Sequence, residues 1–304
     1  MTTHHFDPQC YYTTIGWHEP VLRISPGDRV ITTTVNSGAR DLDEEQVTPG
    51  PNPQTGPFFI EGTEAGDTLV IHIERITPNR PLGYASSVVS ANVVDPEFVR
   101  ELPPRQNAHW SIDQEHGIVT PLNASGRLAN VRLPLAPMLG CFGVAPMGGQ
   151  AISTATSAEH GGNMDYRAFA AGTTVYLPVF APGALFHLGD AHATQGDGEI
   201  TGTGIEIFAE VEFSVELQKG KKIGWPRGET NDYIFTVGNA RPLDQALQHA
   251  TTEMIRWLGQ SYGFDTRSAS TLLGQCVEYD LGNVYNPTYT MVCKVPKRVL
   301  ADHS

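Results

Sequence analysis

The segment 205–217 constrains the fold most, because apolar and polar residues alternate along it almost without a break. Seven apolar side chains fall on one face of this segment. The other face carries Glu206, Glu210, Glu212 and Glu216. Phe208 is the exception to the alternation. A period of two residues is typical of a β-strand with one buried and one solvated face, so we predict a half-buried strand here.

Shorter strands are predicted by the same alternation and by β-branched residues over 29–35, 67–76, 172–180 and 287–295. Pro178 places the third of these at a sheet edge or at a strand end. The chain has 31 Gly and 22 Pro among 304 residues, which is more than one residue in six. Such a composition favours many short strands joined by tight turns over long helices.

Helical periodicity is confined to the C-terminal third. Apolar residues recur at spacings of three and four over 242–262, which predicts an amphipathic helix. Asp265 is suited to cap a second helix that continues through 273–279. We therefore predict a mainly β fold of the α+β class, with a β-sandwich or jelly-roll-like core and a helical layer from the C-terminal third.

The length of the chain allows one large domain or two smaller ones. The Gly- and Pro-rich stretch 134–149 marks a soft boundary. We expect a β-rich N-terminal part over 1–140 and an α+β part over 141–304. One continuous domain is the alternative.

The formal net charge of -13 argues against a nucleic-acid partner, because a negative surface repels phosphates. No apolar run approaches the roughly 18 residues that span a bilayer. The polar N-terminus lacks the pattern of a secretory signal. The four cysteines lie far apart in the sequence, which is typical of reduced thiols in an intracellular protein. We expect a cytoplasmic protein without a membrane partner.

Side chains that support chemistry are dense in two blocks of the sequence. In the first block, His160-Gly-Gly-Asn163-Met-Asp165, two glycines permit a sharp turn. That turn would bring His160, Asn163 and Asp165 toward one point. In the second block, Asp190 and His192 are two residues apart, so they share a face of an extended segment.

Gln195, Asp197 and Glu199 follow among further glycines. Histidine together with carboxylates suits Zn²⁺, whereas a mainly oxygen donor set suits Ca²⁺ or Mg²⁺. Either ion polarises an amide carbonyl or lowers the pKa of a bound water. A nearby carboxylate would then carry a proton to the leaving amine, and Glu199 or the more distant Glu61 is suited to this role.

Several of these residues also have a purely structural interpretation. Gly196-Asp197-Gly198 is a suitable hairpin turn, in which Asp197 would be present only because it tolerates a positive φ. His160 is equally well explained as a hydrogen-bonded structural histidine, and His187 as a buried neutral one. The two blocks together favour a metal site. The sequence has no G-x-S-x-G motif that would indicate a serine nucleophile.

The two blocks and the segments between them resemble the central region of the acetamidase/formamidase family. The resemblance rests on His160-Gly-Gly-Asn-Met-Asp165, Tyr176-Leu-Pro-Val-Phe180, Pro182-Gly-Ala-Leu-Phe186, Gly189-Asp190, His192 and Gln195-Gly-Asp-Gly-Glu199. The earlier segment 55–67, which contains Glu61, matches a second family block. The resemblance runs from about Asp28 to Pro296.

The resemblance implies hydrolysis of short-chain linear amides, such as formamide or acetamide, to the carboxylic acid and ammonia. It also implies a homodimer or homotetramer and a bound divalent metal, Zn or Ca. We predict metal ligands at His160, Asp165, Asp190, His192 and Asp197. We predict catalytic roles for Glu61, Glu199, His160 and Asp190. We predict substrate contacts from Asn163, Gln195 and His187.

Two alternatives stay open at this point. The first is a non-catalytic metal- or ligand-binding protein on the same fold, which would lose much stability on chelation without turning over an amide. The second is a lactamase-type cyclic amidase.

Overall fold

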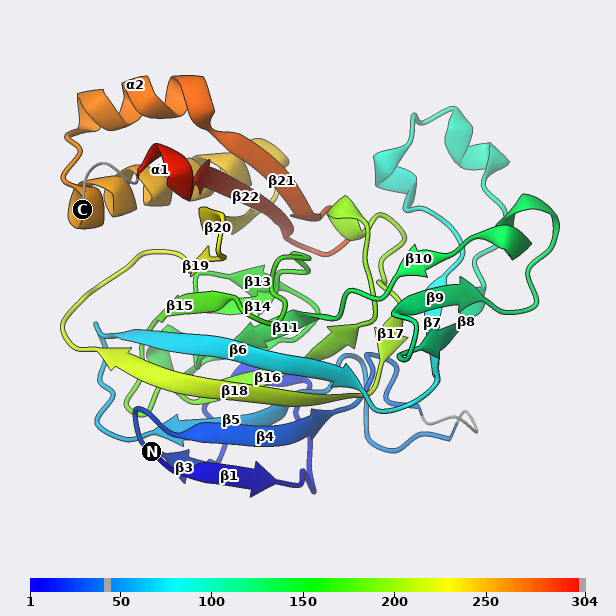
Figure 1. The fold of residues 1–304 in the computed structure, drawn as a ribbon, viewed down its shortest axis with the longest axis horizontal. Helices are drawn as coiled ribbons and strands as arrows, with labels where there is room; N and C mark the ends of the chain where they lie inside the picture. The colour runs from blue at the N-terminus through cyan, green and yellow to red at the C-terminus, as the bar shows by residue number, and fades with distance from the viewer. Residues whose placement is uncertain (41–44, 301–304) are drawn as a thin grey trace.

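Strand β18 (Ala209–Gln218) shows the alternation that its sequence predicts, with side chains alternately buried and partly exposed along most of its length. The structure is a computed structural model that describes residues 1–40 and 45–300. β18 lies between β4 (Arg29–Thr34) and β6 (Thr68–Pro78), and it is antiparallel to both. Figure 1 shows these three strands side by side across the front of the molecule.

Nine strands of the described residues form the first sheet. In spatial order they are β1 (Thr3–Phe6), β4, β18, β6, β15 (Thr174–Pro178), β19 (Arg227–Glu229), β20 (Tyr233–Ala240), β22 (Tyr289–Pro296) and β21 (Glu278–Asn283). All neighbours are antiparallel except β1 and β4. The strands predicted over 29–35, 67–76, 172–180 and 287–295 are confirmed. Pro178 ends its strand, as one of the two predictions for it requires.

Eleven strands of the described residues form the second sheet. Nine follow one another as β10 (Leu133–Pro134), β9 (Ile118–Pro121), β8 (Asn107–Asp113), β7 (Leu82–Ser86), β17 (Glu206–Ile207), β16 (Phe186–His192), β11 (Met138–Gly143), β14 (Gly161–Asn163) and β13 (Ser157–Ala158). β16 also pairs with β5 (Thr55–Ile60), and β5 pairs in parallel with β3 (Leu22–Ile24). β2 (Thr14–Gly16) and β12 (Ala151–Ser153) form a separate pair.

The main core lies between these two sheets. Phe213 of the first sheet meets Phe58 and Phe186 of the second edge-on, with ring centroids 5.4 and 5.5 Å apart. All three rings are at most 1% exposed. Burying one such side chain contributes roughly 1.5–3 kcal/mol, so this contact is a main source of adhesion between the sheets. The face-to-face packing confirms the predicted β-sandwich core.

The C-terminal layer consists of α1 (Leu243–Tyr262) and α2 (Thr266–Cys276). Ala250, Met254 and Leu258 form one buried stripe of α1, and their cluster includes core residues of β20 and β22. Asp265 caps α2 by accepting a hydrogen bond from the Ser268 N–H. The helical layer is therefore confirmed, and Figure 1 shows it over the β20–β22 end of the sheet.

Two sequence predictions about these elements are wrong. The alternating segment 205–217 is divided at Phe208, because Glu206 and Ile207 form β17 in the second sheet and the first-sheet strand begins only at Ala209. Glu206 therefore does not share a solvated face with Glu210, and it is only 2% exposed. The second helix stops at Cys276 and does not continue through 279, because β21 begins two residues later.

Both large sheets combine strands from 1–140 with strands from 141–304. The division of the chain at residue 140 stays a prediction. No helix in the described part of the chain is long and apolar enough to cross a membrane.

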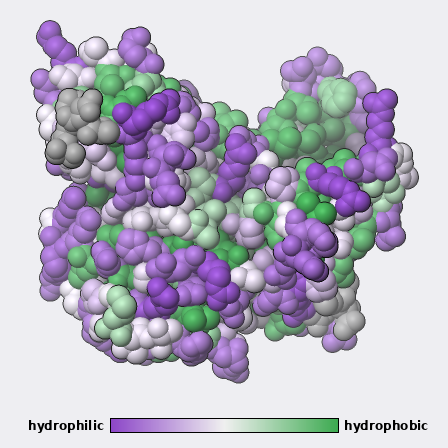
Figure 2. All heavy atoms as spheres, in the orientation of Figure 1, coloured by the Kyte–Doolittle hydropathy of each residue, from purple (hydrophilic) through white to green (hydrophobic). Residues whose placement is uncertain are grey.

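β7 to β10 form an arm at the right of Figure 1. Exposed apolar side chains on this part of the chain include Phe98, Leu122 and Leu128. Figure 2 shows apolar side chains gathered at this side and the surface hollowed between the arm and the helical layer. The turn between β21 and β22 lies near this hollow in Figure 1.

Candidate active site

Strands β14, β11 and β16 lie side by side and carry the first motif block and the start of the second. At one end, Cys141 of β11 pairs with Asn163 of β14 and with Gly189 of β16, the residue before Asp190. Two residues further along β11, Gly143 pairs with His187 of β16 and with Gly161 of β14, the residue after His160. The strands therefore separate the predicted site residues into two groups, about two to three residues apart along the sheet.

The first group, which we call the carboxylate cluster, consists of Asp165, Asp190, His192, Glu199 and Glu206. Each of its side chains belongs to a residue that is at most 5% exposed. The ligand atoms of Asp165, Asp190 and His192 lie within 4.8 Å of one another, as do those of His192, Glu199 and Glu206. Within the described residues, no Lys or Arg is ion-paired with this cluster. Four buried carboxyl groups without such a partner require protons or a bound cation.

His192 lies at the centre of the cluster. Its Nδ1 is 2.9 Å from the side-chain Oε1 of Gln195, an acceptor, so the hydrogen-bond network assigns the Nδ1 proton to this contact. Its Nε2 is 2.9 Å from a Glu206 oxygen and 3.5 Å from an Asp190 oxygen. In the neutral ring, Nε2 would therefore direct a lone pair at two acceptors. A proton or a cation between these atoms removes that conflict.

Side-chain amides hold the carboxylates in place. Asn283 donates from Nδ2 to Asp165 at 2.6 Å and to Glu199 at 2.7 Å. Asn286 donates to the same Asp165 oxygen at 3.0 Å. Asn52 donates to Asp190 at 3.1 Å. These neutral donors fix the carboxyl groups without neutralising their charge.

The backbone at this site is unusual. Eight non-glycine residues of the described chain have a positive φ. Four of them are Asn52 (48°), Asp165 (47°), Asp190 (58°) and Glu199 (44°). Residues in this region cost on the order of 1–3 kcal/mol each and tend to cluster at functional sites. The fold therefore tolerates strain in order to direct these side chains into one place.

Gly140 of β11 permits the close approach of two of these carboxylates. A Cβ atom at this position would lie 2.4 Å from Asp165 Oδ1 and 2.7 Å from Asp190 Oδ2. Both contacts are shorter than any that a real Cβ makes, so a side chain at position 140 would displace the carboxylates.

The cluster shifts the pKa values of its members. Burial raises the pKa of Asp165, Glu199 and Glu206 above their ordinary range, and the neighbouring carboxylates raise it further. Burial lowers the pKa of His192, but the charges of Glu206 and Asp190 outweigh this effect and raise it well above its usual value. Without a bound cation, the cluster therefore retains protons at neutral pH.

A cavity of about 230 Å³ opens beside the cluster. Asp190, Glu199 and Glu206 contribute to its wall, together with Asn163 and Tyr84. Burial raises the pKa of Tyr84 above its ordinary value, so its hydroxyl stays protonated and can donate. A ligand in this cavity would meet three carboxyl groups, three side-chain amides and a phenol.

The second group, which we call the histidine cluster, consists of His18, His160 and His187. The rings of His18 and His187 lie 5.6 Å apart, and His187 Nε2 is 3.3 Å from the carbonyl oxygen of Gly16. Neither ring nitrogen of His160 has a hydrogen-bond partner within the described residues. Burial lowers the pKa of His160 to about 4 and that of His187 to about 3. Both rings are therefore neutral at pH 7.

The expected convergence of the first block is only partly met. Asn163 and Asp165 reach the cavity and the carboxylate cluster, whereas His160 lies with His187. The two glycines after His160 do have positive φ values, 96° and 97°, as a sharp turn there requires. The predicted roles of His160 in catalysis and metal binding stay predictions, as does the role of His187 in substrate binding.

Two other predicted residues lie on the surface. Glu61 pairs with Arg23 at 3.1 Å and its side chain is 48% exposed. Thr55, the first residue of β5, pairs with Leu188, which lies two residues before Asp190. Glu61 directly follows the other end of β5, so it lies about 20 Å from Thr55 along the strand direction. Asp197 pairs with Arg167 at 2.8 Å. The structure does not bring either carboxylate to the cluster.

Sequence reasoning missed four of the polar residues that build the site: Asn52, Glu206, Asn283 and Asn286. Asn52 stands between two prolines, Asn283 is the last residue of β21, and Asn286 lies in the bend before Pro287. An amide in a turn has many structural explanations, so these positions carried no specific signal. Glu206 was hidden by the alternation of its segment. Phe208, two residues later, breaks the alternation, and this break was the available sign that the segment is divided there.

The donor atoms of the cluster fit a divalent cation. Asp165 Oδ1 is buried and has no hydrogen-bond partner among the described residues. His192 Nε2 likewise has none and faces carboxylate oxygens. Histidine nitrogen with several carboxylates is a donor set typical of zinc and of similar borderline ions, whereas calcium takes oxygen ligands.

The chain resembles known proteins over most of its length. Its sequence matches the model of the Acetamidase/Formamidase family over residues 17–149 and 146–301. The structure of an acetamidase from Yersinia enterocolitica is 34% identical with a TM-score of 0.85, covering 98% of this chain and 93% of that chain. A predicted acetamidase/formamidase from the thermophile Thermoanaerobacter tengcongensis is 27% identical with a TM-score of 0.87, covering 100% of this chain and 98% of that chain.

A curated acetamidase from Mycolicibacterium smegmatis is 28% identical over an alignment of 263 positions, and the match covers 68% of this chain and 63% of that protein. The chain thus spans less than two thirds of that relative's length. The family match nevertheless includes both motif blocks, and the solved structures share the whole fold. The chain therefore belongs to the acetamidase/formamidase family.

Proposed function

We propose that this protein hydrolyses short linear amides to the carboxylic acid and ammonia. One observation carries the proposal: a buried His–carboxylate cluster with strained backbone opens onto a cavity of about 230 Å³. A cavity of this size suits a small substrate. The names of the family and of its relatives indicate which C–N bond is cleaved.

We assign a divalent cation, with zinc preferred over calcium, to Asp165, Asp190 and His192, with Glu206 beside them. When bound, such an ion polarises an amide carbonyl and lowers the pKa of a water. Gln195 orients the imidazole by accepting from Nδ1. Its Nε2 donates to the Asp165 carbonyl oxygen at 2.5 Å, so we now assign Gln195 to positioning His192 and not to substrate contact.

Glu199 is our candidate for proton transfer. Asn283 occupies its Oε2, which leaves Oε1 to take a proton from water and to deliver one to the leaving nitrogen. Asn163 and Tyr84 line the same cavity and are placed to hydrogen-bond the substrate amide. Burial of the site excludes bulk water and strengthens each of these interactions.

Asp197 and Glu61 hold surface ion pairs, so we do not include them in this scheme. We also propose that the protein works as a homodimer or homotetramer in the cytoplasm. The family resemblance supports the first part of this proposal, and the thiol content supports the second.

The proposal is tested by ammonia release from formamide, acetamide and propionamide, and from a panel of small lactams. Each substrate is measured with the protein as purified, after chelation, and after Zn²⁺ or Ca²⁺ is returned. Ammonia release from a linear amide that chelation abolishes and one ion restores would support both the proposed reaction and the proposed metal. Release from lactams alone would replace the linear substrate with a cyclic one. No release at all, with a large loss of stability on chelation, would favour a non-catalytic binding protein.

A further inference from the structure

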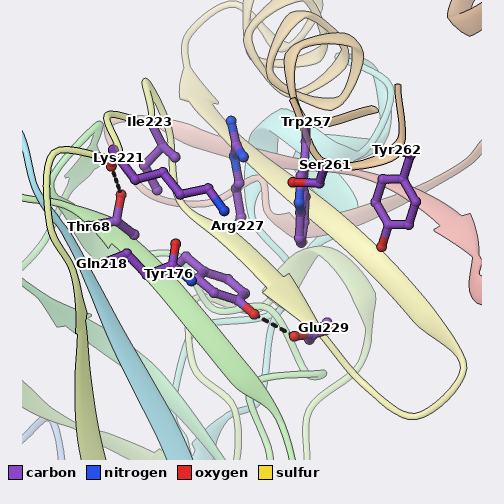
Figure 3. Close-up of a pocket in the computed structure, with 10 residues that line it drawn as sticks. All are labelled: Thr68, Tyr176, Gln218, Lys221, Ile223, Arg227, Glu229, Trp257, Ser261 and Tyr262. Atoms are coloured by element: carbon purple, nitrogen blue, oxygen red, sulfur yellow. Dashed lines mark hydrogen bonds between the residues drawn. The ribbon is translucent and has the colours of Figure 1, made fainter. Parts of the chain in front are cut away.

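A second cavity, of about 190 Å³, lies between the first sheet and α1. Figure 3 shows Trp257, Ser261 and Tyr262 extending from α1 toward Tyr176 and Glu229 on the sheet. This cavity shares no lining residue with the one beside the carboxylate cluster. It is therefore a separate feature of the molecule.

Three of the ten residues that line this cavity are aromatic. The rings of Tyr176 and Trp257 lie 5.7 Å apart at an interplanar angle of 68°, and Tyr262 lies beyond them on the last turn of α1. The guanidinium of Arg227, which also lines the cavity, lies 5.2 Å from the ring centroid of Trp257. An aromatic ring offers a face against which a ligand with a planar body can pack.

The charges around the cavity are compensated, with one exception. Arg227 is paired with Glu253 at 2.6 Å and also donates to Gln260. Glu229 is paired with Lys297 at 2.8 Å and accepts from the Tyr176 hydroxyl. Lys221 is a lining cation with no acidic partner in the described part of the chain, and Figure 3 shows its amino group directed into the cavity.

Several other donors at the cavity are equally free. Within the described residues, no hydrogen bond engages the side chains of Gln218, Ser261 or Tyr262. Together with Lys221 they offer an ammonium, an amide and two hydroxyl groups. The cavity therefore presents one net positive charge, three additional polar groups and three aromatic side chains.

We propose that this cavity binds a small organic monocarboxylate with a flat apolar body. The carboxylate pairs with Lys221 and accepts from the hydroxyl groups, and the planar body lies against Tyr176 and Trp257. A single ammonium matches one negative charge, which favours a monocarboxylate over a multiply charged phosphate. The inference is independent of the proposed amide hydrolysis, since it uses no residue of the carboxylate cluster.

Benzoate is the probe for this site, and its binding is followed by isothermal calorimetry on the full-length protein. We expect saturable binding that Lys221→Ala weakens at least about tenfold, because a hydrogen bond to a charged group is lost. The exposed neighbour Lys222 does not line the cavity, so Lys222→Ala is the matched control and changes the affinity less than about twofold. Lys221 is itself exposed, so its replacement leaves folding intact.

Three further measurements locate the ligand. Benzoate should change the tryptophan fluorescence of the wild type, and Trp257→Phe should abolish the contribution of Trp257 to this change. Asp190→Asn should leave benzoate affinity unchanged, which separates this site from the carboxylate cluster. Benzyl alcohol, which is flat but uncharged, should bind at least about tenfold more weakly. No saturable binding of benzoate, or equal affinity in the Lys221→Ala protein, would overturn the proposal.

Discussion

The two ends of β14, β11 and β16 both carry buried titratable side chains, yet they are built in opposite ways. At the carboxylate cluster, Asn52, Asn283 and Gln195 hold the acids and His192 in fixed positions. At the histidine cluster, His160 is buried with both ring nitrogens unpartnered within the described residues. For this reason we assign the ion and the substrate to the end of the strands where fixed donors converge, and not to every histidine of the motif.

The largest effect on turnover is expected from Glu199→Gln. The variant keeps the size of the side chain and the Asn283 contact but cannot exchange a proton, so ammonia release should fall by about 10²–10⁴-fold. Metal content, measured by mass spectrometry, should stay unchanged. The matched control is Glu61→Gln, because Glu61 lies on the surface with Arg23. Equal losses in the two variants would contradict the distinction between the two glutamates.

A smaller loss is expected from Gly140→Ala. The added methyl group would lie 2.4 Å from Asp165 Oδ1 and would force the two carboxylates apart. We expect metal affinity and turnover to fall together by about 100-fold, at the upper end of effects from residues that support ligands. A Cβ added at Gly274 would have no atom within 4 Å, so Gly274→Ala is the control and should leave metal affinity and turnover unchanged. An active Gly140→Ala protein would show that these carboxylates need not converge.

A weaker effect is expected from Gln195→Ala, which removes the acceptor of the His192 Nδ1 proton. Metal affinity should fall by about tenfold, because the ring loses its orientation while every ligand stays in place. Gln195→Glu keeps an acceptor at this position and should restore part of the affinity. If the substrate KM changes while metal affinity does not, then Gln195 contacts substrate, as its sequence position first suggested.

The smallest effect on turnover, and a distinct effect on stability, is expected at the histidine cluster. His160 has a folded pKa of about 4, below the ordinary value near 6.5, because burial disfavours its charged form. The unfolded chain therefore binds a proton first as the pH falls. Stability from this group is complete above about pH 6.5 and declines by about 3 kcal/mol down to pH 4.

The measurement is urea unfolding of the wild type and of His160→Leu between pH 7 and pH 4. The variant should lose part of this pH dependence whatever its absolute stability, and its metal content should equal that of the wild type. A variant that loses its metal would instead support the prediction that His160 is a ligand.

The strands and helices could largely be predicted from the sequence, because burial on one face produces a visible period. β6, β18 and α1 are examples. The pairing of strands could not be predicted, since it depends on contacts between distant segments. Glu206 shows the consequence: it belongs to an alternating segment, but the chain changes sheets at Phe208 and buries it beside His192.

Only part of the site is visible in the sequence, for a similar reason. Asp165, Asp190, His192 and Glu199 carry chemistry that a sequence pattern displays, and they converge in the structure. The supporting amides Asn52, Asn283 and Asn286 come from two distant segments and have no such pattern. His160 stands in the same motif as Asp165 but lies at the other end of the strands, because β14 extends between them.

We propose above all that the carboxylate cluster holds a divalent ion that amide hydrolysis requires. The most direct test is to measure metal content and ammonia release together in the wild type and in Asp190→Asn. We expect the wild type to retain about one ion per chain and to release ammonia, and the variant to lose both. An Asp190→Asn protein that releases ammonia at the wild-type rate without metal would contradict the claim.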